Sequence, residues 1–533
     1  MYRNKELLWK SIAVPVAATL LLVGCAGGAD TGSGAATDVL SEGMRGATDS
    51  GDPVSGGTLS FGAYSEPAAL DPAVAIAAVT TGGIEMLNIY DSLLRFDTES
   101  NEFVPQMAQS IDHDDDFRTW TLTLRDGVSF SNNMPLDAAA VKASQERYAG
   151  KQAPEAALWN DSVESIETSG DRTVTYTLNK SWSDFPGLLT TGPGMIVSTE
   201  SDGPDGKFTP IGAGPFTLAA WAQADSMTLS AREDYWAGEP NLDALRIVYL
   251  PGTQVGLETM YNGGIDSTFV REPDEVDEVV DREMSGYVNM TAAANAALIN
   301  ATEGRPGADL RVRKAMQLAI DPQLITQRAF GNADLGDGAI FPEYSRWHTQ
   351  TQATPVDPEE AKQLLAAAMA DGYDGKLDVI DASDPASQQT ALAVEAQLEA
   401  VGFDVTVDLM PTIGDQVRTI AKERNYDLAA WGLSYRESDP FPKMQATMHS
   451  EGKQAYGMYT SPEMDSLIDE LQLASDKDEK AELVDQIQQQ VNKDVPYLVY
   501  SSFAEFVVWN PTVHGVVGSS NSMVLFGTAW KSQ

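Results

Sequence analysis

Hydrophobic and polar positions alternate in short runs along the first half of the chain, a pattern typical of half-buried β-strands. The alternation is most regular at residues 58–64 and 119–124. A turn at 125–127 predicts that residues 128–130 return as a hairpin partner of the second run. The same pattern predicts further strands at 172–178, 217–221, 227–229 and 245–250.

The second half of the chain alternates strands with helices. Strands are expected at 377–380, 403–409 and 427–431, and the helices between them at 387–401 and 413–424. This order predicts a parallel sheet and an α/β fold. Ligands of such sheets bind beyond the carboxyl ends of the strands. The sequence therefore draws attention to the segment that follows residue 431.

That segment, residues 432–441, has an unusual mixture of side chains. Gly432 ends the predicted strand, and two prolines, Pro440 and Pro442, are expected to prevent regular structure. Aromatic and acidic residues that suit a concave binding site lie here, together with the aromatic residue that ends the strand. They are Trp431, Ser434, Tyr435, Glu437 and Asp439. The alternative interpretation is a solvated surface loop.

The N-terminus has the pattern of an exported lipoprotein. Residues 1–24 combine a basic start with an apolar run too short to span a bilayer comfortably, as in a signal peptide. The sequence at 22–25, LVGC, resembles the lipobox of bacterial lipoproteins, which implies cleavage before Cys25 and lipidation of its thiol. Cys25 is the only cysteine of the chain. Residues 25–56, rich in small and polar residues, are expected to form a flexible tether.

Length and charge limit the number of domains and the kinds of partner that the protein can have. A chain of 533 residues is too long for one core, so two or three domains are expected. The net charge of −43 repels nucleic acid and anionic lipid headgroups. Membrane association would therefore depend on the lipid and not on surface charge.

Motifs of catalysis and of metal binding are not found in the sequence. The four histidines lack metal-site spacing, and there is no nucleophile elbow, P-loop or dinucleotide fingerprint. The acidic run at 112–116 lacks the glycine and glutamate of a calcium loop, which favours a solvated turn. We expect neither an enzyme nor a bound metal or cofactor, although a hydrolase with a pair of carboxylates distant in sequence is an open alternative.

Several short motifs, in order, resemble the oligopeptide, dipeptide and nickel class of extracytoplasmic solute-binding proteins, also called family 5. The resemblance runs from about residue 57 to the C-terminus, and each motif is weak alone. The motifs are IYDSLLRFD (89–97), FVPQMA (103–108), TWTLTLRDGVSF (119–130), PIGAGPF (210–216), YWAG (235–238), LRVRKAM (310–316), DPEEAKQLL (357–365) and YDL (426–428).

The resemblance implies a two-lobed clamp of the periplasmic-binding-protein type II, in the three-domain variety of oligopeptide binders. The first lobe would comprise residues 57–89, 201–300 and 507–533, with a second domain inserted at 90–200. The second lobe would comprise residues 301–506. Such proteins enclose a solute between their lobes, and they deliver it as monomers to an ABC permease and its ATPases.

The resemblance also implies site residues. Relatives often carry an Asp, three residues after the position of Trp431, that pairs with the ammonium group of a peptide, but Ser434 stands there in this chain. Glu437 or Asp439 could replace the missing charge; otherwise the ligand is a sugar or another solute without an amine. The run 292–297, nearly all alanine, predicts open space beside Asn295. Tyr64 and Glu66 complete the candidate ligand-binding residues.

Two other classes of function compete with import. One is the secreted lipoprotein hydrolase, and the other is a receptor lipoprotein that senses the same solutes without transporting them. The missing motifs argue against the hydrolase, whereas nothing in the sequence separates transport from sensing. Nickel is the less expected cargo because the histidines are scattered.

Overall fold

The structure is a computed structural model that describes residues 42–46, 51–332 and 335–532. Cys25, the predicted signal peptide and most of the predicted tether lie outside these residues. Within the described ranges, no helix is long and apolar enough to cross a membrane.

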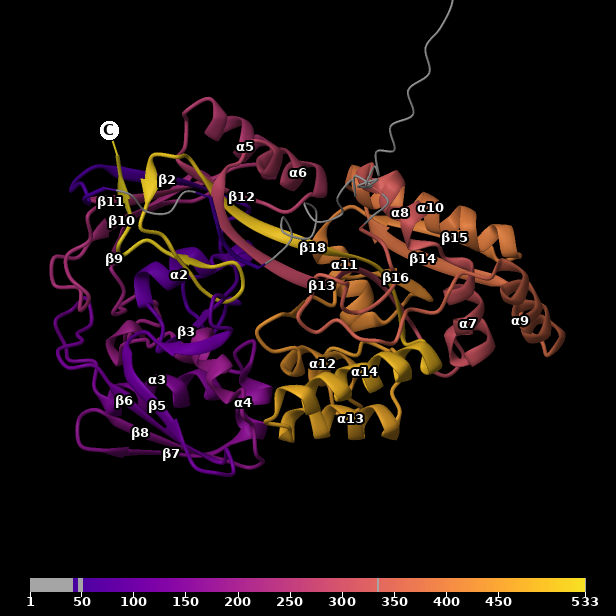
Figure 1. Cartoon of the computed structure of the whole chain (residues 1–533), viewed down its shortest axis with the longest axis horizontal. Coiled ribbons are helices and arrows are strands. Elements are labelled where there is room, and N and C mark those ends of the chain that lie inside the picture. Colours follow the sequence, from indigo (N-terminus) through magenta and orange to yellow (C-terminus); the bar gives the residue numbers. More distant parts are fainter. Residues whose placement is uncertain (1–41, 47–50, 333–334, 533) are drawn as a thin grey trace, which may run out of the picture.

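Two long antiparallel strands cross the centre of a mixed sheet. They are β13 (Ser285–Ile299) and β18 (Tyr497–Trp509), and Figure 1 shows them running from one half of the molecule to the other. The sheet continues on one side through β12 (Ser267–Val270), β2 (Thr58–Ala63), β11 (Ala244–Tyr249), β10 (Ser226–Ala231) and β9 (Phe216–Ala222). The other side is built by β16 (Leu428–Ala430), β14 (Lys376–Ala382) and β15 (Asp404–Met410).

The second side of the sheet confirms the predicted parallel arrangement. Strand β14 pairs in parallel with β15 and with β16. Helices α9 (Pro358–Ala370) and α10 (Pro385–Val401) each begin with an aspartate whose side chain accepts backbone N–H groups, followed by a proline. The predicted helix at 413–424 forms as α11 (Ile413–Val417), which continues into a π-helical segment at 418–423.

A separate four-stranded sheet lies in the first half of the molecule, in the order β5 (Ala108–His113), β6 (Thr119–Leu124), β8 (Thr173–Leu178) and β7 (Val163–Ser169). The alternation in β6 is confirmed, because its three apolar side chains are buried. The predicted hairpin with residues 128–130 is wrong: both edges of β6 are occupied by β5 and β8. Only an isolated bridge between Ser129 and Pro135 forms in that region.

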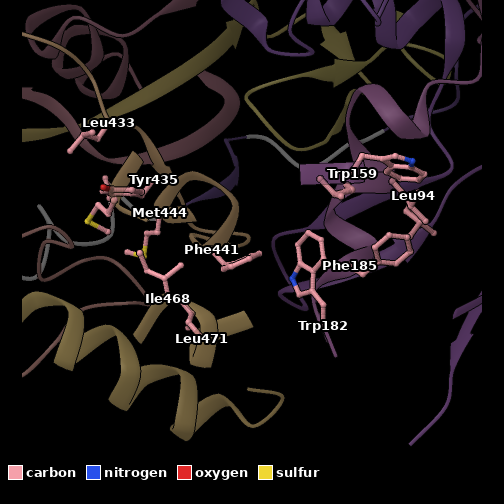
Figure 2. Close-up of a cluster of buried hydrophobic side chains, with 14 of the residues drawn as sticks. Leu94, Trp159, Trp182, Phe185, Leu433, Tyr435, Phe441, Met444, Ile468 and Leu471 are labelled. Carbon is pink, nitrogen blue, oxygen red and sulfur yellow. The ribbon is translucent and has the colours of Figure 1, made fainter. Parts of the chain in front are cut away.

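The half of the molecule that contains the four-stranded sheet, here called the first half, and the half that contains β14, β15 and β16, here called the second half, also meet through a shared hydrophobic cluster. Figure 2 shows Trp159, Trp182 and Phe185 from the four-stranded region facing Phe441, Met444 and other side chains from the second half. The rings of Trp182 and Phe441 make an edge contact with centroids 5.3 Å apart. Burial of side chains of this size stabilises by about 1.5–3 kcal/mol each. The structure thus describes a form in which the two halves are closed on each other.

Candidate functional site

A cavity of about 350 Å³ lies where three parts of the molecule converge. One wall comes from residues 76–80 and from helix α4 (Ala156–Ser162) with the residues before it. The floor comes from β13 and β18, and the opposite wall from residues 434–454, which belong to the second half. A second cavity, of about 320 Å³, is lined only by residues 317–356 and 491–499. The first cavity is the candidate site because both halves of the molecule enclose it.

The floor of the cavity is set by strand register. The short strand β17 (Tyr435–Arg436) adds to β13, with Arg436 opposite Thr291. On the other edge of β13, Glu505 of β18 lies opposite Asn289. Directly opposed residues and residues two apart share one face of a sheet, so these four side chains point to the same side. All four line the cavity.

Two cations stand in this cavity without a carboxylate in contact. The Arg436 guanidinium makes no hydrogen bond or ion pair with any described residue, and burial lowers the pKa of Arg436. Lys443, in helix α12 (Phe441–Met448), donates its Nζ to Gln454 Oε1 at 2.8 Å. Burial, and then the charge of Arg436, lower the pKa of Lys443 to about 8. The two positive charges therefore repel each other across the site.

Acidic groups also line the site. Burial raises the pKa of Glu505, whose Oε2 accepts a hydrogen bond from the Ser522 hydroxyl. Asp439 precedes α12, and its Oδ1 accepts the Phe441 N–H at 2.9 Å. Its Oδ2 is buried and has no hydrogen-bond partner among the residues that the structure describes. Burial, and then the neighbouring Asp184, raise the pKa of Asp439 to about 8.

Of the residues that the sequence suggested, Ser434 and Asp439 line the cavity. Tyr435 and Glu437 do not, because they point to the opposite side of β17. Tyr435 is fully buried, with its hydroxyl 3.5 Å from the Tyr497 hydroxyl. Glu437 accepts the Ser345 hydroxyl at 2.6 Å and the Arg346 N–H at 3.1 Å. The structure thus places both in the packed interior, and their selection as ligand contacts is corrected.

The predicted open space beside Asn295 is filled. Ala292, Ala293, Ala296 and Ala297 are buried in hydrophobic clusters, and Asn295 lies at a β-bulge opposite Ser501. Trp431 packs edge-on against Tyr456, with ring centroids 5.8 Å apart. Neither Asn295 nor Trp431 lines the cavity. The four buried alanines therefore serve close packing of the interior.

Tyr64 and Glu66 also lie outside the cavity lining. The Tyr64 ring is 5.2 Å from the Arg271 guanidinium and meets Phe269 edge-on. Glu66 accepts the Trp221 indole N–H at 2.7 Å and a backbone N–H at 3.0 Å, near the turn between β9 and β10. Both side chains serve the local packing of the first half.

The proline-rich end of the predicted loop is helical. Helix α12 starts at Phe441, and Pro442 occupies one of its first positions. Proline is tolerated there because the first N–H groups of a helix have no intrahelical acceptor. This helix brings Lys443 to the cavity. Arg436 belongs to the segment that the sequence singled out, whereas Lys443, Asn289, Thr291 and Glu505 were not selected from the sequence.

Metal ligands are not grouped in the structure: among the residues that it describes, no three His, Cys, Asp or Glu side chains are placed to hold a metal ion.

The sequence profile of the bacterial extracellular solute-binding proteins, family 5 Middle, matches residues 102–455. The chain belongs to this family. The solute-binding protein is similar to heme-binding protein A of Haemophilus influenzae, with 24% identity over 85% of this chain and 88% of the relative. It is also similar to a probable di/tripeptide-binding protein 5 of Pseudomonas aeruginosa, with 25% identity over 87% and 93%.

Solved structures confirm the fold. The oligopeptide-binding protein AppA of Bacillus subtilis, in complex with a nonapeptide, superposes with a TM-score of 0.74 at 20% identity, covering 90% of this chain and 100% of AppA. The solute-binding protein therefore has the predicted α/β fold of the type II periplasmic binding proteins.

Proposed function

We propose that this protein is the substrate-binding component of an ABC importer, and that it captures a peptide or similar small solute in the cavity over β13 and β18. The observation that carries the proposal is the position of the cavity. Its walls come from opposite halves of the molecule, so opening the halves would expose it and closing them would bury its occupant.

The proposed lobes follow the division expected from the sequence. Residues 57–89, 201–300 and 507–533 would form one lobe, 90–200 an inserted domain, and 301–506 the other lobe. Strands β13 and β18, which the two halves share, would then contain the hinge.

An acidic side of the cavity supports a ligand with a free amine. Asp439 and Glu505 line the site, and within the described part of the chain Asp439 Oδ2 has no hydrogen-bond partner. An ammonium group would supply the missing donor and would favour the charged carboxylate. Asp439 would thus take the place of the aspartate that Ser434 replaces.

The lipid anchor is a further part of the proposal, supported by the LVGC sequence that ends at Cys25. It would hold the protein on the outer face of the cell membrane. The Cys25→Ala variant should be released into the medium or remain uncleaved. Fractionation of the variant with the membrane, as for the wild type, would contradict lipidation.

Native mass spectrometry of protein purified from its own host tests the main proposal. We expect a small solute to co-purify, and the same solute to bind the emptied protein in calorimetry. A solute that the protein converts chemically would favour the hydrolase instead. If a peptide binds unchanged and its uptake by cells survives deletion of this protein, a sensing role would be favoured over import.

A further inference from the structure

We propose that Arg436 and Lys443 form an anion subsite, and that the ligand carries a carboxylate which lies between them. This inference rests on the proposed function, because it names the chemistry of the solute that the cavity takes. It differs from the sequence-based expectation, which placed only carboxylates of the protein against a cationic group of the ligand.

The first argument is the missing partner of Arg436. Buried or half-buried guanidinium groups are normally paired with carboxylates or hydrogen-bonded to carbonyls. Elsewhere in this chain Arg313, which is buried, donates to the carbonyl oxygens of Asp494 and Gly307 at 2.8 and 2.7 Å. Arg147 is paired with Asp71 and Asp202. Arg436, at the cavity floor, has no such contact within the described residues, so its donors are available to a ligand.

The second argument is the proximity of two positive charges in one cavity. The chain has 78 acidic and only 35 basic side chains, yet Arg436 and Lys443 are close enough in one cavity for the first to disfavour the charge of the second. Like charges that share a desolvated site are unfavourable unless an opposite charge joins them. An anionic group placed between them would remove the repulsion and would receive charge-assisted hydrogen bonds from both.

The surrounding acids define the class of anion. Glu155, Asp439 and Glu505 act on Arg436 through their charges, and none of the three contacts it as an ion pair. They would repel a dianion such as a phosphate ester, whereas a carboxylate carries a single charge. Two of them, Asp439 and Glu505, would face an amine at the other end of the ligand. The ligand class is therefore an amino-carboxylate, either a peptide with a free C-terminus or a non-peptide amino acid conjugate.

Calorimetry with matched acid and amide probes tests the subsite. The probes are trialanine and its C-terminal amide, and for the non-peptide source an N-alkyl amino acid and its amide. Wild-type protein should bind at least one acid more tightly than its amide by about tenfold to a hundredfold, the range expected for a charge-assisted hydrogen bond. The acid that is bound identifies the source of the carboxylate.

Three variants test whether the preference for the acid over the amide comes from Arg436. Arg436→Gln should bind acid and amide alike, and Arg436→Lys should keep part of the preference because the charge remains. Lys477→Gln is the control, because Lys477 is an exposed lysine that does not line the cavity. Its preference for the acid should be unchanged. Equal binding of acid and amide by the wild type, or a full preference in Arg436→Gln, would overturn the subsite.

The remaining outcomes separate this inference from the proposed function. If Lys477→Gln loses as much preference as Arg436→Gln, the effect comes from the general electrostatic field of the protein and the subsite is wrong. If no probe binds but a co-purified solute without an acidic group does, the subsite is wrong and solute binding stands. If neither the probes nor any co-purified solute binds, both proposals fail.

Discussion

At the scale of single residues, alternation along β17 decides which side chains can meet a ligand. Ser434 and Arg436 point to the cavity, whereas Tyr435 and Glu437 point into the packed interior. Adjacent residues of one short segment thus have different tasks. Substitution of the inward residues should change stability, and substitution of the outward ones should change binding.

We expect Asp439→Asn to weaken binding of a free-amine peptide by about tenfold or more, because a partly desolvated ammonium would lose its charged partner. Binding of the N-acetylated peptide should change little. Glu437→Gln is the comparison, since Glu437 accepts hydrogen bonds from Ser345 and Arg346 and faces away from the cavity. It should lower the free energy of unfolding by about 1–3 kcal/mol while peptide affinity stays unchanged. Calorimetry measures the affinities, and thermal unfolding measures the stabilities. If Glu437→Gln lost peptide affinity while Asp439→Asn kept it, the orientation of β17 would be contradicted.

The preference for acid over amide probes should depend on pH through Lys443. Its pKa is lowered to about 8 in the empty cavity, so the ammonium form is lost as the pH rises through that value. The acid-to-amide ratio of affinities should therefore fall between about pH 7 and about pH 9, and the amine common to both probes cancels in the ratio. In Lys443→Arg the ratio should stay constant over this range. A constant ratio in the wild type would exclude Lys443 from the subsite.

At the scale of elements, the passage from β16 to β17 positions the wall of the cavity. Both strands pair with β13, and Gly432 lies between them beside the backbone of β13. A Cβ atom at Gly432 would be 2.8 Å from the Ala294 carbonyl oxygen, which belongs to the backbone and cannot swing aside. A glycine at position 432 is therefore required for the segment between β16 and β17 to lie this close to the backbone of β13.

Gly432→Ala should destabilise the protein by roughly 1–3 kcal/mol, as expected for overpacking, and should weaken ligand binding because β17 shifts with it. Gly150→Ala is a matched control: Gly150 ends helix α3 (Ala138–Gly150), and a Cβ atom there would meet nothing within 4 Å. Thermal unfolding and calorimetry of both variants provide the measurement. If Gly432→Ala and Gly150→Ala had the same stability and the same ligand affinity, the close contact between Gly432 and β13 would not matter.

At the scale of the whole molecule, side-chain contacts hold the two halves together next to the cavity. Lys480, in helix α14 (Lys477–Asp494), pairs with Asp184 and donates to the Ser183 hydroxyl of the first half at 2.8 Å. Lys180 pairs with Asp469 at 2.8 Å. The ring of Trp182, which lies between Lys180 and Asp184 in the sequence, meets the ring of Phe441 edge-on. An open form would lose all of these contacts, so they favour closure.

Lys480→Met should shift the empty protein toward an open form, seen as a larger radius of gyration in small-angle scattering. Its apparent ligand affinity should fall by about tenfold, because part of the binding free energy would be used to close the lobes. Lys477→Met is the control, since Lys477 is exposed near the start of the same helix. Wild-type protein should become more compact, or stay compact, on saturation with ligand. An unchanged profile and affinity in Lys480→Met would mean that the contact does not bias closure.

The sequence alone determined the α/β class and the parallel strands of the second half, because both depend on a local period of apolar residues. It also drew attention to residues 432–441, and three residues of that segment, Ser434, Arg436 and Asp439, line the cavity. The choice of residues within that segment depended on long-range pairing. Strand β17 exists only because β13, about 140 residues earlier, offers an edge to it.

Tertiary structure alone decided which charges share the cavity. Glu505, Asn289 and Arg436 come from three distant strands, and only the register of the sheet aligns them on one face. The eight residues first suggested for ligand binding were chosen by chemical type within one segment or by a family resemblance, and two of them line the cavity. Proximity in sequence cannot tell which face of a strand a side chain occupies, because that depends on the partner strand and on the core beneath it.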